Sequence, residues 1–299
     1  MTKEFKAHIS VLTVNLIYGA NYSITKQVMP AYIQPFGIIV IRVLPCALLF
    51  FLAGFLIKKE KILREDKIKL ILCALFGVAI NQMLFFKGLS LTVPINGALI
   101  MTTNPILVLL MGAIIIKERV SWTKVTGIII GISGAISLIV YGKNFSLGVG
   151  SMTGDVLIFI NSVSFAIFII MVKPLMKKYH PITISKWIFF FGSFMILPFG
   201  YDEFAAVKWN SIPFTIWLCI LFIVLGVTFI AYLMNIFALR TLSPTTVSSY
   251  IYFQPMFATI MSLIMGEGKP HLIHFVSSAL IFTGVYLVSK PTRRITLSS

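Results

Sequence analysis

Residues 94–105 read PINGALIMTTNP, and residues 244–255 read PTTVSSYIYFQP. Each stretch begins and ends with proline, and the two copies are 150 residues apart, half of the 299-residue chain. Gly134 and Gly284 are separated by the same interval. Proline within a helix removes a backbone donor and leaves a carbonyl free one turn earlier. The pattern therefore predicts two related halves with a helix break at the same place in each.

The composition around these stretches is that of a membrane protein. Hydrophobic residues make up 58% of the chain, charged residues make up 11%, and the mean hydropathy is +0.98. A soluble domain has about 25% charged residues. We therefore expect an all-α, polytopic membrane protein with ten transmembrane helices. Apolar runs place these helices at residues 7–28, 34–57, 69–91, 94–116, 122–141, 154–172, 182–200, 212–239, 244–265 and 271–289.

Five predicted helices fall in residues 1–150 and five in residues 151–299. At an offset of 146 residues, Asn15 matches Asn161 and Pro35 matches Pro181. Because five is odd, the second five-helix repeat enters the membrane from the opposite side. Inverted repeats are characteristic of secondary transporters, whose halves rock about a site near the midplane and give alternating access to it.

The net charge of +16 is explained by topology. With the amino terminus inside, 19 basic residues fall on the cytoplasmic side and three on the other, as the positive-inside rule requires. We expect a multi-pass plasma membrane protein with both termini cytoplasmic and the lipid bilayer as its partner. Nucleic acid is not needed as a partner.

The chain resembles the EamA family of the drug/metabolite transporter superfamily along essentially its full length. The resemblance rests on motifs in both halves, namely Tyr18-Gly19-Ala20-Asn21 leading to Lys26, then Arg42, Asn104-Pro105, Glu118, Gly127, Gly131 and Gly134, and in the second half Gln254-Pro255, Glu267 and Gly284. Tyr18 stands where the family commonly has Trp. The resemblance implies ten spans, inverted five-helix halves and export or import of amino acids, related metabolites or drugs.

One stripe of polar residues follows the first predicted helix. Asn15, Tyr18, Tyr22 and Lys26 are spaced by three, four and four residues, so they share one helix face. Unsatisfied polar groups in hydrocarbon cost several kcal/mol, so this face is expected to meet protein or water. Either it is a wall of the substrate pathway or it forms hydrogen bonds between helices.

Arg42 is the most informative charge, because it lies about eight residues inside the second predicted helix. Lys26 and Lys87 lie near the outer ends, where snorkelling to the headgroups explains them equally well. All nine acidic residues sit at the amino terminus, in loops or at span ends, as Asp155 does, so none lies deep inside a predicted span. We therefore expect the counter-ion of Arg42 to be a carboxylate or other anionic group of the substrate, and a pump for lipophilic cations is disfavoured.

Further polar residues inside the predicted spans are candidates for binding substrate: Asn81, Gln82, Asn104, Asn161, Ser164, Tyr232, Asn235, Tyr252 and Gln254. Pro105 and Pro255 are candidate gates or helix breaks, with carbonyls freed near Met101 and Ile251. Kinks that only shape the packing are the alternative.

Neither a cofactor nor a catalytic or metal site is expected. Glu267, His271 and His274 have ligand-like spacing, but the polarity of a loop explains them more simply. Gly127 and Gly131 form a G-x-x-x-G motif that predicts close helix packing, within the chain or between protomers of a homodimer.

The leading hypothesis is a secondary transporter that exports amino acids or related carboxylate-bearing metabolites. A multidrug or other solute efflux transporter of the same superfamily is the first alternative. A non-transporting membrane assembly protein is another, and a membrane enzyme is the least favoured, because the sequence has no paired nucleophile and base.

Overall fold

A computed structural model describes residues 2–92, 97, 100–117, 120–141, 152–264 and 271–290. Within these ranges every regular element is a helix, so the all-α class is confirmed for the described chain. The first half contains α1 (Lys3–Val28), α2 (Pro35–Ala53), η1 (Gly54–Leu56), α3 (Arg64–Ala74), η2 (Leu75–Ala79), α4 (Ile80–Leu91), α6 (Asn104–Ile115) and α7 (Trp122–Tyr141).

The second half follows the same order. It contains α8 (Met152–Leu175), α9 (Pro181–Ala205), η3 (Trp209–Ser211), α10 (Phe214–Leu221), η4 (Phe222–Ile230), α11 (Ala231–Leu239), α12 (Pro244–Ser249), η5 (Tyr250–Tyr252), α13 (Phe253–Ile264) and α14 (Leu272–Ser289). Pro35, Pro181 and Pro244 each occupy the first turn of their helix, where a missing N–H costs nothing.

Described helices fall in each of the ten predicted intervals. Six are long and apolar enough to cross a bilayer, and they begin at Pro35, Arg64, Met152, Pro181, Phe214 and Leu272. The full set of ten spans stays a prediction. Several boundaries differ from the expected ones by a few residues; the third helix begins at Arg64 instead of residue 69, and α9 continues to Ala205 instead of residue 200. Charged residues therefore extend both helices beyond their apolar runs.

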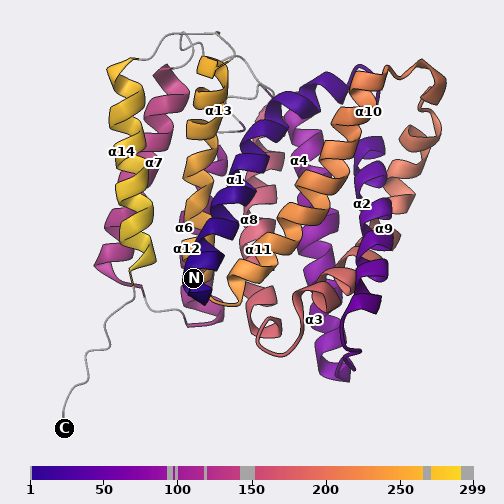
Figure 1. Ribbon diagram of the computed structural model, residues 1–299, viewed down its shortest axis with the longest axis horizontal. Coiled ribbons are helices and arrows are strands. Elements are labelled where there is room, and N and C mark those ends of the chain that lie inside the picture. Colours follow the sequence, from indigo (N-terminus) through magenta and orange to yellow (C-terminus); the bar gives the residue numbers. More distant parts are fainter. Residues whose placement is uncertain are drawn as a thin grey trace.

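Helices of the first half pack against helices of the second half throughout the molecule. The helix α7 lies along α14, α2 along α9, α4 against α8, and α1 against α11 (Figure 1). Two further contacts, α6 with α8 and α1 with α13, complete the centre. The core of the molecule is thus the boundary between the halves.

Glycine permits the closest of these pairs, α7 with α14. A Cβ on Gly127 would lie 2.8 Å from the carbonyl oxygen of Gly284, and a Cβ on Gly134 would lie 2.7 Å from that of Ser277. Such approaches exclude any larger residue. The G-x-x-x-G motif is therefore used within the chain, against the glycine that ends the 150-residue repeat.

Carboxylates join α2 and α9 at both ends of this pair. Glu203, near the end of α9, accepts hydrogen bonds from the backbone N–H groups of Phe36 (2.6 Å) and Gly37 (3.0 Å) in the first turn of α2. At the opposite end, Glu60 accepts from the backbone N–H of His180, the N-cap of α9, at 2.9 Å. Negative charge at a helix N-terminus is favourable, so each helix is capped from the other half.

A second polar cluster joins the start of α3 to the connection between α8 and α9. Buried Asp66 accepts hydrogen bonds from Lys178 Nζ and from the Tyr179 hydroxyl, each at 2.9 Å. Hydrogen bonds to Asp66 and Glu65 raise the pKa of Lys178 above its usual range. This cluster ties the halves together at the molecular end where α1 begins (Figure 1).

Candidate functional site

Each half contains a helix interruption just before its second repeated proline. Thr102 and Thr103 form a turn immediately ahead of α6, whose first turn contains Pro105. In the second half the single 3-10 turn η5 separates α12 from α13, which contains Pro255. The expected breaks are therefore present near both prolines, and a gating role for them stays a prediction. Pro94, which opens the first repeated stretch, lies outside the described residues.

The third predicted helix of each half contains a π-helical segment, which the sequence did not lead us to expect. These segments, η2 and η4, interrupt the α-helical hydrogen bonding and leave carbonyls for other donors. Ser164 on α8 donates to the Phe76 carbonyl in η2 at 2.7 Å. Cys46 on α2 donates to the Val224 carbonyl in η4 at 3.2 Å. Each segment contains one glycine, Gly77 in η2 and Gly226 in η4.

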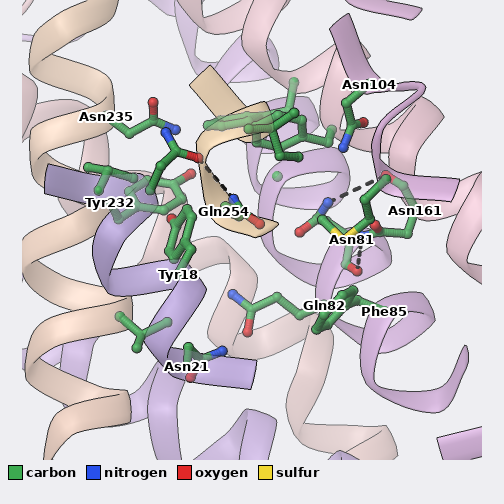
Figure 2. Close-up of a pocket in the computed structure, with 18 of the residues that line it drawn as sticks. Tyr18, Asn21, Asn81, Gln82, Phe85, Asn104, Asn161, Tyr232, Asn235 and Gln254 are labelled. Atoms are coloured by element: carbon green, nitrogen blue, oxygen red, sulfur yellow. Dashed lines mark hydrogen bonds between the residues drawn. The ribbon is translucent and has the colours of Figure 1, made fainter. Parts of the chain in front are cut away.

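The π segments and the helix breaks surround a central cavity of about 160 Å³ (Figure 2). Ten residues predicted from the sequence line it: Asn15, Tyr18, Arg42, Asn81, Gln82, Asn104, Asn161, Tyr232, Asn235 and Gln254. Met101 and Ile251, the predicted sites of freed carbonyls, line it as well. The lining comes from both halves, so the cavity exists only when they pack together.

Side-chain amides connect the halves across the cavity. Gln254 Nε2 on α13 donates to Asn15 Oδ1 on α1 at 2.9 Å, where Gly19 allows close approach to the Gln254 backbone. Asn161 Nδ2 on α8 donates to the Asn81 backbone carbonyl at 2.7 Å (Figure 2). Asn15 and Asn161, matched by the sequence offset of 146, thus each bond to the other half, Asn15 as an acceptor from a side chain and Asn161 as a donor to a backbone carbonyl.

Arg42 is buried in the cavity wall, with 8% of its surface exposed. Its Nε donates to Thr228 Oγ1 at 2.9 Å, and its Cζ lies 5.2 Å from the centroid of the Phe86 ring. The ion pairs found among the described residues join Lys69 and Lys178 to Glu65 and Asp66, and none of them includes Arg42. The guanidinium therefore has no carboxylate partner in the described part of the chain.

Three uncharged groups of the lining have a buried atom without a hydrogen bond to any described residue. They are Gln82 Oε1, Asn104 Oδ1 and the Tyr232 hydroxyl. The amides of Gln82 and Asn104 approach the cavity from opposite sides in Figure 2. A buried polar atom without a partner costs about 1 to 3 kcal/mol, so such atoms are poised for a ligand or water.

Four predicted site residues are absent from the described lining of this cavity. Tyr252 is fully buried away from it, with its ring against Gly131 on α7. Tyr22 and Lys26 belong to α1, but their side chains lie outside the described ones. Ser164 bonds to η2 instead of lining the cavity. Lys87 is exposed, as expected for a snorkelling lysine.

Sequence reasoning missed two residues that hold Arg42. They are Thr228 and Phe86, which the sequence analysis did not single out within their apolar runs. Both line the cavity only because α2 packs against η4 and α4. Asn21, part of the quoted motif in α1, also lines the cavity.

The two described residues of the triplet with ligand-like spacing, His271 and His274, form a helix cap. The backbone N–H of His271 donates to His274 Nδ1 at 3.1 Å, within a capping box at the start of α14. Glu267 and Glu118 lie outside the described residues. The two histidines are therefore accounted for by capping.

Comparison with known proteins shows similarity to transporters along nearly the whole chain. The EamA-like transporter family matches residues 5–140 and again residues 152–290. The chain is 25% identical to the uncharacterized transporter YyaM of Bacillus subtilis (strain 168), covering 96% of this chain and 94% of that protein. It is also 25% identical to a WAT1-related protein of Arabidopsis thaliana, covering 91% and 79% respectively. A solved crystal structure at 16% identity has the same fold, with a TM-score of 0.75 over 94% of this chain and 95% of that one.

Proposed function

The chain belongs to the EamA-like transporter family, and from that premise we propose that it exports amino acids or related carboxylate-bearing metabolites across the plasma membrane. The proposal combines a binding cavity between the two halves with a buried cation in its wall. Transport proceeds by alternating access, with each half rocking about the cavity.

An inverted pair of five-helix repeats, residues 1–150 and 151–299, is the mechanical part of the proposal. It is supported by features that occur once in each half: the helix break before a proline, the π segment in the third helix, and the carboxylate cap. The double match of the family, once per half, supports it too. Cytoplasmic termini follow from the 19 to three distribution of basic residues.

Arg42 is the single observation that carries the substrate class. A buried guanidinium without a carboxylate partner is costly, and a substrate anion entering the cavity would neutralise it. The neighbouring amides and tyrosines are uncharged, so they suit the remainder of a small polar or zwitterionic molecule. Tyrosine faces and free carbonyls would meet an ammonium group.

A ligand panel on purified protein tests the proposal directly. The twenty L-amino acids and their C-terminal amides are compared by thermal shift, because a ligand stabilises in proportion to the logarithm of its concentration over its Kd. We expect at least one amino acid to raise the Tm and its amide to have little effect. Counterflow of that amino acid in proteoliposomes then demonstrates transport.

The same ligand panel can also contradict the proposed function. Stabilisation by lipophilic cations alone would replace this proposal with the multidrug alternative. An amino acid and its amide that stabilise equally would remove Arg42 from recognition. Binding without counterflow would favour a protein that does not transport.

A further inference from the structure

Thr228 is oriented toward Arg42 by the π-helical segment in which it lies. Its hydroxyl donates to the Ile223 carbonyl, five residues earlier, at 2.7 Å, and Thr228 is only 2% exposed. A hydroxyl has one hydrogen to donate. Because that hydrogen is committed to Ile223, the Thr228 oxygen can act toward Arg42 only as an acceptor, and it accepts from Nε at 2.9 Å.

Phe86 restrains the guanidinium from a second direction. The Cζ of Arg42 lies 5.2 Å from the ring centroid of Phe86, which is itself buried. A cation over an aromatic face is attracted to the ring. The Nε bond and the ring contact together restrain the guanidinium from two directions.

The remaining donors of Arg42 are the four N–H groups on its two terminal nitrogens. These present two parallel donors at the end of the side chain, which match the two oxygens of a carboxylate. Since Nε is already occupied, a carboxylate in the cavity can bind the guanidinium through two parallel bonds only at this end-on pair. The arrangement favours a carboxylate over a neutral amide of the same size.

We propose that Thr228 is a positioning residue that determines specificity for carboxylates by holding Arg42 end-on to the cavity. The inference rests on the proposed function and adds to it a role for the π segment η4. Without the extra residue of the π turn, the bond from Thr228 to the carbonyl five residues earlier would not form. The irregular backbone is thus the source of the orientation.

The test compares two substitutions of Thr228 in the purified full-length protein. Thr228→Val keeps the branched shape and removes the hydroxyl, whereas Thr228→Ser keeps the hydroxyl. Kd is measured for the L-amino acid giving the largest thermal shift and for its C-terminal amide. Thr13→Val is the control, because Thr13 makes a comparable hydrogen bond within α1, to Ile9 O at 2.9 Å, and does not line the cavity.

We expect Thr228→Val to weaken binding of the amino acid about tenfold and to change binding of the amide less than twofold. Thr228→Ser and Thr13→Val should each remain within about twofold of the wild type for both ligands. In an Arg42→Gln background, adding Thr228→Val should have no further effect on binding, because Thr228 acts through Arg42. In counterflow, Thr228→Val should raise KM while leaving the maximal rate within about twofold, since the bond lies in the binding site.

Several results would overturn the inference. If Thr228→Val weakens binding of the amino acid and of its amide equally, the role of Thr228 is merely structural. The same conclusion follows if the effects of Thr228→Val and Arg42→Gln on binding are additive. An Arg42→Gln variant that loses discrimination while Thr228→Val retains it would leave the proposed function standing and remove Thr228 from it. No binding of any amino acid to the wild type would overturn both.

Discussion

The two π-helical segments occupy equivalent places in the two halves, yet they serve different chemistry. In the first half, η2 presents Gly77 to the cavity, and the Phe168 ring of α8 packs directly against it. In the second half, η4 presents Thr228, which binds Arg42 of α2. Each segment therefore contacts a helix of the opposite half, one through an aromatic ring and one through a charge.

This difference separates what the two halves share from what one of them has alone. The backbone irregularity is common to both halves, and in both a side chain of the other half donates to a freed carbonyl. Within the described residues, the buried cation Arg42 and the Thr228 hydroxyl that holds it belong to the η4 side. We infer that the repeat supplies a symmetric frame, while binding of the anionic group depends on the η4 side.

The largest effect is expected from removing the cation. Arg42→Leu should weaken binding of the amino acid about a hundredfold, because a buried charged partner is lost. The Tm of the ligand-free protein should stay the same or rise, since an unpaired buried charge is removed. Thermal shift with and without ligand measures both.

Arg240→Leu is the matched control, because Arg240 is exposed at the end of α11 and the substitution changes the net charge equally. A similar loss of binding in the control would indicate a general electrostatic effect. Unchanged binding in Arg42→Leu would contradict the assignment of anion binding to the η4 side.

An intermediate effect, on stability, is expected from replacing the glycines of the two π segments with alanine. A Cβ at Gly77 would lie 2.7 Å from Phe168 Cγ and Cε2, so Gly77→Ala should cost about 1 to 3 kcal/mol of stability. The three atoms nearest to a Cβ at Gly226 would all belong to the Phe222 side chain of the same helix, the closest at 3.3 Å. Thermal unfolding in detergent should show a clearly lower Tm for Gly77→Ala than for Gly226→Ala, and the reverse order would refute the described packing of η2.

The smallest loss of stability is expected from removing the Ser164 hydroxyl, which donates a hydrogen bond to η2. Ser164→Ala leaves the Phe76 carbonyl without its hydrogen bond and should cost about 1 kcal/mol. Ser162, two residues earlier on α8, is buried with a hydroxyl that bonds to no described residue, so Ser162→Ala should be neutral or slightly stabilising. Equal Tm values for the two variants would argue against a role for Ser164 in satisfying the π segment.

Much of the fold followed from the sequence because the bilayer imposes simple rules. Apolar runs located described helices in all ten intervals, and Pro35, Pro181 and Pro244 marked helix starts. The polar residues within those runs identified ten residues of the cavity lining, since hydrocarbon excludes unsatisfied polar groups. The same reasoning also predicted Tyr252 as a lining residue, but Tyr252 packs against Gly131 instead. A buried polar residue can avoid hydrocarbon without lying at a binding site.

By itself, the sequence determined the helical class, the family resemblance and the presence of a buried cation, since these depend on composition and on spacing along one chain. Tertiary structure alone decided which groups surround that cation. Thr228 and Arg42 are 186 residues apart and meet only because α2 packs against η4. The π turn that orients Thr228 is a backbone irregularity, and its hydrogen bonds have no distinct signature in the pattern of apolar residues.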